Sequence, residues 1–224
     1  MKADLAENKW IVERLEVGML MVGCYIVGWK ATGDAIVIDP GDEADRILDR
    51  VKELGLKVVA VVNTHGHGDH IGGNSEIARK TGAPIWIGEK DAPMLIDKMK
   101  NLSEPVGMPV TSPPADRLLK EGDVVQVGDG ELKVLEAPGH SLGSILLVGD
   151  GIVFVGDVLF AGSIGRTDFP NGSLETLLKM IREKIFPLGD DFIVCPGHGP
   201  ETTVGEEKRG NFFLQPGFNP GMYM

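Results

Sequence analysis

Short apolar runs separated by turn-forming residues recur along the whole chain. Most runs are four to eight residues long and are bounded by Gly, Pro, Asn or Asp, a pattern that is typical of β-strands. Ten strands are predicted, at residues 10–17, 19–28, 35–38, 58–62, 84–87, 124–127, 132–136, 144–148, 152–155 and 192–195.

Helical spacing of apolar residues is less frequent than strand patterning. The first predicted helix has Asp42 as its N-cap and Gly55 as its stop, and the last has Ser173 as its N-cap and ends before Pro187. Four helices are predicted in all, at about residues 43–54, 75–80, 89–98 and 174–185.

Many strands interleaved with few helices favour an α/β fold. Each sheet must bury one face and each amphipathic helix must cover another, so two sheets packed face to face with helices on the outer faces are expected. The length of 224 residues suits one domain, and no linker divides it, so residues 1–224 are predicted to form a single domain.

Two stretches of the chain are predicted to be irregular. Residues 99–115 carry four prolines and are expected to form a long loop, which in compact domains is often functional. The tail at residues 211–224 places Phe212, Phe213, Phe218 and Tyr223 between glycines and prolines. Exposed aromatic residues are a liability, so the tail is expected to pack on the domain or on a partner chain, with a homodimer as one possibility.

Composition and charge narrow the class of partner. The chain is 42% hydrophobic and 25% charged, which is ordinary for a globular protein, and its net charge of −11 argues against nucleic acid or an anionic membrane. An anionic substrate would need a local cationic patch. Cys24 and Cys195 lie in or beside apolar runs and are predicted to be buried thiols, and the start of the chain lacks a signal-peptide core. The expected location is the cytoplasm.

Histidines and aspartates cluster after the predicted strand at residues 58–62. In extended backbone, residues two apart project to the same side, so His65 and His67 can converge on one ion. Asp69 and His70 fall on the following turn, displaced enough to serve a second ion. Gly66 removes a side chain between the first two ligands.

Three further candidates each follow an apolar run of their own. His140, Asp157 and His198 come after the predicted strands at 132–136, 152–155 and 192–195, and strand ends at one sheet edge are where such sites form. All five histidines of the chain belong to these segments. Nitrogen and carboxylate ligands without thiolate suit zinc, iron or manganese.

The segment from Thr64 to Gly73, together with Ala137–Ser141, Gly156–Asp157 and Pro196–Gly199, resembles the metallo-beta-lactamase fold superfamily. The resemblance implies an αββα sandwich of two mixed sheets and two divalent metal ions, with zinc the expected metal. It also implies the ligand sets: His65, His67 and His140 for metal 1, Asp69, His70 and His198 for metal 2, and Asp157 bridging both.

Residues 162–170 and 203–209 look like those of the short bacterial glyoxalase II-like hydrolases, which lack the helical glutathione-binding domain. Arg166, in the first of these segments, is the candidate for binding a substrate carboxylate, and an internal pair with Asp168 is the alternative. The resemblance suggests that Asp39 orients a ligand histidine, and a plain turn aspartate is the alternative.

The expected activity is thioester hydrolysis of S-lactoylglutathione-like substrates by a hydroxide bridging two metal ions, with Asp69 and Asp157 as catalytic residues. Lactone or ester hydrolysis on the same site is one alternative. A second is a mononuclear-iron oxidoreductase, because the segment around Arg166 is also similar to persulfide dioxygenases. A third is a scaffold in which ions only cross-link strand ends.

Overall fold

The structure is a computed structural model that describes residues 9–218. Its first sheet has antiparallel strands at one edge and parallel strands at the other, so it is a mixed sheet. In spatial order its strands are β1 (Trp10–Val17), β2 (Val22–Trp29), β3 (Asp34–Ile38), β4 (Lys57–Asn63), β5 (Ile85–Gly88) and β6 (Arg117–Leu119).

The second sheet is also mixed, because β10 and β13 pair in parallel while its other strands pair antiparallel. In spatial order its strands are β14 (Thr202–Thr203), β13 (Ile193–Pro196), β10 (Ile152–Gly156), β9 (Ile145–Gly149), β8 (Gly130–Glu136) and β7 (Val124–Val127). A small separate hairpin consists of β11 (Leu159–Phe160) and β12 (Ser163–Ile164).

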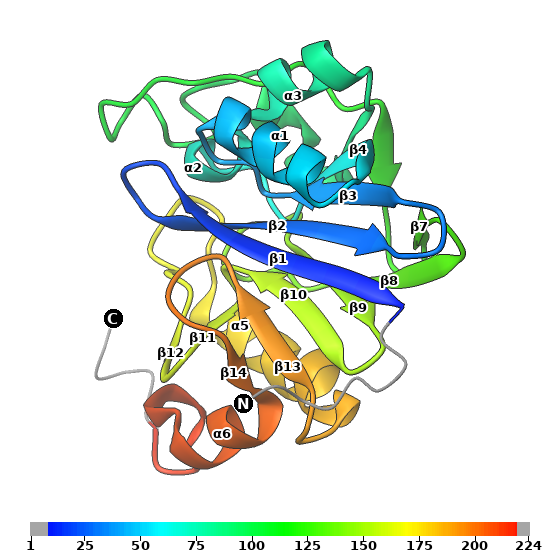
Figure 1. Ribbon diagram of the computed structural model, residues 1–224. Helices are drawn as coiled ribbons and strands as arrows, with labels where there is room; N and C mark the ends of the chain where they lie inside the picture. The colour runs from blue at the N-terminus through cyan, green and yellow to red at the C-terminus, as the bar shows by residue number, and fades with distance from the viewer. Residues whose placement is uncertain (1–8, 219–224) are drawn as a thin grey trace.

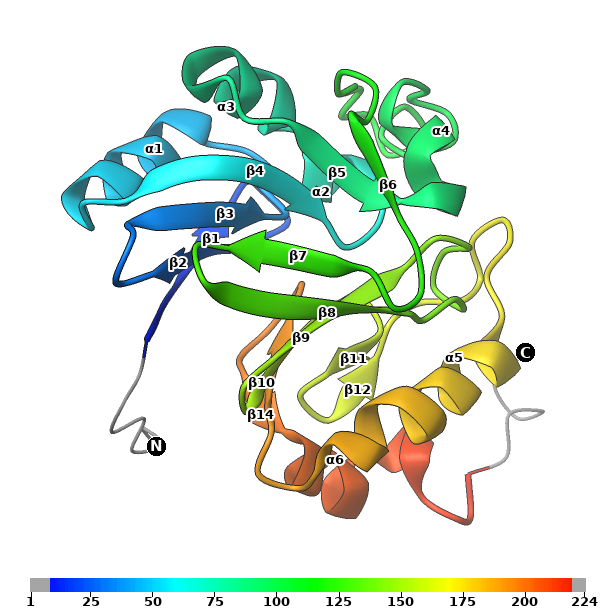
Figure 2. The same ribbon diagram turned by 90° about the vertical axis from the view of Figure 1, so that its right-hand side faces the viewer.

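Helices cover the outer face of each sheet (Figures 1 and 2). The first sheet carries α1 (Ala44–Glu53), α2 (Gly68–Ile71), α3 (Asn74–Thr81) and α4 (Ala92–Leu95), and the second carries α5 (Leu174–Met180) and α6 (Val204–Gly210). A π-helical turn at Ile181–Ile185 extends α5. The predicted αββα sandwich of two mixed sheets is therefore confirmed.

Three apolar layers hold the sandwich together. The central layer fills the space between the sheets, where Tyr25 of β2 meets Phe154 of β10 edge to face with ring centroids 5.1 Å apart. A second layer packs α1 and α3 on the first sheet through Ile47 and Ile77, and a third packs α5 on the second sheet through Leu177. Both sheets are thereby rigid platforms for the loops at their edges.

Several boundaries differ from the sequence-based predictions. The second strand begins at Val22 because residues 18–21 form the turn of the β1–β2 hairpin, in which Gly18 and Met21 have positive φ. The helix predicted at 89–98 is only a 3-10 turn followed by α4. Asp42 is not the N-cap of α1, since that position belongs to Glu43. The sequence patterns did not predict the short elements β6, β11, β12, β14 and α6.

Both thiols and part of the tail can be placed. Cys24 and Cys195 are free and buried, as predicted. Phe213, Leu214 and Phe218 pack on the apolar layer beneath the second sheet, whereas residues 219–224, including Tyr223, lie outside the described residues. Between residues 9 and 218, no helix has the length and hydropathy required to cross a bilayer.

Candidate metal centre

The histidine-rich segment starts directly after β4 and ends in α2. His65 and His67 lie in the connection, and Asp69 and His70 lie on the single turn of α2. The glycine at position 66 is required by close packing, because a Cβ there would lie 2.7 Å from the Cβ of Met94 in α4. The histidine-rich segment is thus packed tightly against α4, and this packing fixes the direction of the segment's side chains.

The second sheet supplies the other candidates from the ends of three strands. His140 follows β8, Asp157 follows β10 and His198 follows β13. Asp157 and His198 are brought together by the parallel pairing of β10 with β13, and the backbone N–H of Gly197 donates to the carbonyl of Gly156 at 2.8 Å. The predicted site residues from both sheets therefore meet at one edge of the sandwich.

The first group of ligand atoms belongs to three buried histidines. One ring nitrogen from each of His65, His67 and His140 lies within 4.8 Å of the others. Nε2 of His140 is 2.9 Å from Nδ1 of His67, which is hydrogen-bond distance, and the two ring planes are nearly perpendicular, at 86°. The three residues match the set predicted for metal 1, and their role as ligands stays a prediction.

The second group comprises Asp69, His70 and His198, again within 4.8 Å of one another. Oδ2 of Asp69 lies 3.3 Å from Nε2 of His198 and 3.7 Å from Nε2 of His70. These atoms are too far apart for strong hydrogen bonds. Around a tetrahedral ion with bonds of about 2.1 Å, neighbouring ligand atoms lie about 3.4 Å apart. The spacing is therefore that of ligands to a shared ion.

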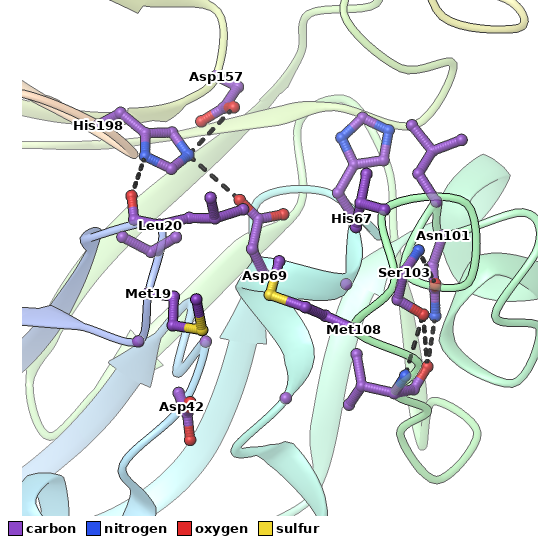
Figure 3. A pocket seen from close by; sticks show the side chains of 18 of the residues that line it. Met19, Leu20, Asp42, His67, Asp69, Asn101, Ser103, Met108, Asp157 and His198 are labelled. Atoms are coloured by element: carbon purple, nitrogen blue, oxygen red, sulfur yellow. Dashed lines mark hydrogen bonds and ion pairs between the residues drawn. The ribbon is translucent and has the colours of Figure 1, made fainter.

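Asp157 lies between the two groups. Figure 3 shows it beside His198, whose ring also approaches Asp69. Its Oδ1 is 3.4 Å from Nε2 of His70, in the second group, and its Oδ2 is 3.6 Å from Nε2 of His140, in the first. The same Oδ2 is 3.6 Å from Nε2 of His198. One carboxylate thus reaches both groups, which is the position that a bridging ligand requires.

In four of the histidines, a hydrogen bond from Nδ1 fixes the orientation of the ring. The acceptors are the Thr64 hydroxyl for His65 at 3.1 Å, Asp39 Oδ2 for His70 at 3.0 Å, the Arg166 carbonyl for His140 at 2.7 Å and the Leu20 carbonyl for His198 at 3.1 Å. An Nδ1–H donor leaves Nε2 as a lone-pair acceptor, which is the form that binds a metal.

Asp39 contacts His70 directly and is connected to His65 through the Thr64 hydroxyl. Its Oδ1 accepts from the Thr64 N–H at 2.7 Å, and its Oδ2 accepts from both the Thr64 hydroxyl at 2.6 Å and Nδ1 of His70. It is buried and has a positive φ of 50°, a conformation that aspartate tolerates better than most residues. These contacts are the ones that an orienting role requires.

Asp91 was not among the predicted site residues. Its buried carboxylate accepts from the Gly66 N–H at 3.0 Å, the Ser141 hydroxyl at 2.6 Å and the Gly143 N–H at 2.7 Å. It therefore ties the segment between His65 and His67 to the segment after His140. The sequence signal for it is weak, since Asp91 stands in an ordinary helix-start pattern far from any histidine.

The orphaned atoms of the cluster fit divalent ions. Among the residues described, Nε2 of His65, Nε2 of His70 and Oδ1 of Asp157 are buried side-chain atoms without a hydrogen-bond partner. Leaving such atoms unsatisfied is costly, and one cation in each of the two groups would satisfy all three. The donor set of imidazole nitrogens and carboxylate oxygens suits zinc, iron or manganese.

The electrostatics of the cluster agree with this fit. Burial, with the neighbouring imidazoles, lowers the pKa of His65 well below its usual value and lowers that of His67 to about 3. Burial also opposes a proton on His70, but Asp157, Asp69 and Asp39 outweigh it and raise its pKa well above the usual value. In the absence of ions, a proton on His70 supplies the positive charge that these carboxylates require.

A cavity of about 690 Å³ opens onto the cluster. His67, Asp69, His140, Asp157 and His198 are all among its lining residues. His65 and His70 lie deeper and do not reach it. The cluster therefore has a buried side that is held by the protein and an open side where a small molecule can bind.

Arg166 also lines this cavity, but its guanidinium is paired. Its Nε and Nη2 donate to the carboxylate of Asp168 at 2.9 and 2.7 Å, and its Cζ lies 4.3 Å from the ring centroid of Phe169. The internal pair considered from the sequence is present. The role of Arg166 in binding a substrate carboxylate stays a prediction.

Comparison with known proteins gives a consistent picture. The family model of the metallo-beta-lactamase superfamily matches residues 17–198. The chain is 37% identical over 207 residues to the hydroxyacylglutathione hydrolase GloC of Haemophilus influenzae, an alignment that covers 91% of this chain and 97% of that protein.

Solved structures with the same fold differ in what they are named for. The BLEG-1 B3 metallo-beta-lactamase superposes with a TM-score of 0.87 at 34% identity, covering 91% of this chain and 99% of its own. TTHA1623 in a di-iron-bound form superposes with a TM-score of 0.81 at 33% identity, covering 91% of this chain and 100% of its own. ETHE1 from Myxococcus xanthus superposes with a TM-score of 0.78 at 32% identity, covering 90% of this chain and 83% of its own.

Proposed function

Since this chain belongs to the metallo-beta-lactamase superfamily, we propose that it is a binuclear metallohydrolase that cleaves thioesters of the hydroxyacylglutathione type. The observation that carries the proposal is the position of Asp157, whose two oxygens reach two separate groups of ligand atoms at the floor of a cavity. A site built only to cross-link strands would not need an open side.

The residues assigned to the ions follow from these two groups. His65, His67 and His140 would hold one ion, Asp69, His70 and His198 the other, and Asp157 both. Bound divalent ions lower the pKa of water toward neutrality and polarise a substrate carbonyl. Zinc is our first choice, and iron is supported by the di-iron form of a similar structure.

The protein's own groups then position the reaction and manage its protons. The oxygen of water forms a bond to the thioester carbon while the carbon–sulfur bond breaks, giving a carboxylic acid and a thiol. Asp69 lines the cavity with 22% of its side chain exposed, and we assign it the role of taking the proton that the attacking water loses. That proton is returned to the leaving sulfur.

No side-chain nucleophile is needed for this route. Both cysteines are buried, and burial raises the pKa of each thiol well above its usual value. Ser141 adjoins His140, but its hydroxyl is engaged by Asp91 at 2.6 Å. A hydrolytic water is therefore the attacking group that the site accommodates.

The test combines metal analysis with an activity assay. Protein reconstituted with zinc is expected to hold two ions per chain and to release thiol from S-lactoylglutathione. His140→Ala is expected to lose an ion and to reduce thiol release to the uncatalysed rate, whereas Lys133→Ala, exposed on the preceding strand, is the matched control. Purified protein with one iron per chain that consumes oxygen with glutathione persulfide would overturn the hydrolase assignment.

A further inference from the structure

The cavity beside the metal centre has one strongly apolar wall. We use the term apolar wall for the side chains that line it from the β1–β2 hairpin and from the loop after α4. They are Val17, Met19, Leu20, Val22, Leu102, Val106, Met108 and Val110. Figure 3 shows Met19 and Met108 in this cavity together with Asp69.

Three residues of the apolar wall are exposed in a way that folding alone does not require, whereas Val17 and Val22 at its base are buried. Met19 is 86% exposed, Leu20 46% and Val106 56%. Single exposed apolar residues are common, but a group of them around one cavity marks a surface that binds something apolar. Methionine adapts its shape to different apolar ligands.

Two polar side chains that line the cavity from the loop after α4, Asn101 and Ser103, are hydrogen-bonded within the loop. Ser103 accepts from the Val110 N–H at 3.0 Å, and Asn101 donates to the Val110 carbonyl at 2.9 Å (Figure 3). The Gly68 N–H donates to the carbonyl of Asn101 at 2.8 Å, which fixes the loop to the start of α2. These internal bonds engage the two polar side chains of the loop that line the cavity, so what the loop leaves free for a ligand is largely apolar.

Outside the metal centre, the side chains of the cavity offer little to an anionic ligand. Among the residues that the structure describes, its lining includes no lysine and a single arginine, Arg166, which is paired with Asp168. Asp42 lines the cavity as well, and the whole chain carries a net charge of −11. A glutathione conjugate brings two carboxylates, and apart from the ions of the proposed metal centre the described lining offers no unpaired cationic side chain to bind them.

We propose that the preferred substrate is a thioester with an apolar acyl chain and an uncharged thiol, in which the acyl chain lies along the apolar wall. The inference rests on the proposed thioesterase activity and ranks the substrates within it: hydroxyacylglutathiones are cleaved, but less efficiently than thioesters with an apolar acyl chain and an uncharged thiol. The reaction is unchanged: water attacks the thioester carbon, the carbon–sulfur bond breaks, and an apolar carboxylic acid and a neutral thiol are released.

The test uses the zinc-loaded full-length protein and thioesters of N-acetylcysteamine, an uncharged thiol, with acetyl, butyryl, hexanoyl and octanoyl groups. Full burial of one methylene changes an affinity by about fourfold. We expect kcat/KM to rise at least tenfold from acetyl to hexanoyl. Hexanoyl-glutathione, which has the same acyl group on an anionic thiol, is expected to be cleaved at least tenfold less efficiently than hexanoyl-N-acetylcysteamine.

Two neighbouring methionines provide matched variants. Met19→Gln places an amide on the apolar wall. It is expected to reduce the ratio of kcat/KM for the hexanoyl thioester to kcat/KM for the acetyl thioester at least threefold. Met21→Gln changes a side chain that is 63% exposed and does not line the cavity, and it is expected to keep the ratio of the unmodified protein. Asp168→Asn removes the partner of Arg166 and is expected to raise kcat/KM for hexanoyl-glutathione alone.

The outcomes separate the two proposals. A flat response to acyl length, or a preference for glutathione thioesters, overturns the apolar substrate class while thioesterase activity stands. An equal effect of Met19→Gln and Met21→Gln also overturns it, because the cavity side chain then has no special part. Failure to cleave any thioester overturns the proposed function itself.

Discussion

Oδ2 of Asp39 lies 3.0 Å from Nδ1 of His70, and both side chains are almost completely buried. This carboxylate holds the imidazole so that Nε2 faces Asp69 and Asp157. Asp39→Asn is expected to lower the affinity for the second ion by about 10- to 100-fold, because an amide cannot accept from both Thr64 and His70 through both of its ends. Competition with a chromophoric chelator measures the change.

Asparagine is the informative replacement at this position. It also tolerates the positive φ of residue 39, so the backbone is kept. The surface variant Asp49→Asn, on α1, is the matched control and should bind metal like the unmodified protein. Unchanged affinity in Asp39→Asn would mean that packing alone orients His70.

Asp91 is expected to matter for stability as well as for the site. Both of its oxygens accept hydrogen bonds from N–H or O–H groups. Asp91→Asn replaces one oxygen with an NH₂ group, which faces one of these donors and leaves buried polar groups unsatisfied. The free energy of unfolding should fall by about 1–3 kcal/mol, and metal affinity at the first group should fall with it. Denaturant unfolding and chelator competition measure the two effects.

Ser141→Ala provides the comparison for Asp91. This change removes one donor to the carboxylate and leaves the Gly66 and Gly143 bonds in place. A smaller loss than in Asp91→Asn is therefore expected. If both variants behave like the unmodified protein, Asp91 does not hold the two histidine-bearing segments together.

Gly197 is required by the close approach of Asp157 and His70. A Cβ at this position would overlap Oδ1 of Asp157 and lie 2.7 Å from Cε1 of His70. Gly197→Ala is expected to displace the bridging carboxylate and to abolish binding of the second ion, as metal content per chain would show. Gly210→Ala, where a Cβ meets nothing within 4 Å, should leave metal content unchanged and slightly stabilise α6.

Metal removal should destabilise the whole sandwich, because the candidate ligands come from both sheets. With free ion about 1000-fold above its dissociation constant, binding contributes about 4 kcal/mol to the free energy of unfolding. Chelation is then expected to lower Tm by about 8–16 °C. Zinc should restore it, and a Tm that is unaffected by chelator would argue against resident ions.

The sequence was informative wherever long apolar runs and side chains of distinctive chemistry coincide. The positions of His65, His140 and Asp157 after such runs were enough to predict that they meet, because a strand end fixes where the following residue lies. Short elements such as β11 and β14 have only two residues each, which is too short to show a periodic pattern. Whether they form strands depends on the segments with which they pair.

Other features depend on contacts between distant segments. Asp91 acts through hydrogen bonds to residues that are 25 to 52 positions away in the chain, which no local pattern encodes. The pair between Arg166 and Asp168 is local, yet the sequence alone left open whether it forms or whether the cation stays free. Tertiary packing therefore decides the partners of Asp91, whereas the pair between Arg166 and Asp168 depends on the local conformation of an exposed loop.

Leu20 has two separate roles at the tip of the β1–β2 hairpin. Its carbonyl accepts from Nδ1 of His198, while its side chain lines the cavity. The support of the histidine is thus a backbone property that any residue with this conformation can provide. Side chains at the tip are therefore free to diverge among related proteins, so that one metal centre can be retained while the range of acceptable substrates changes.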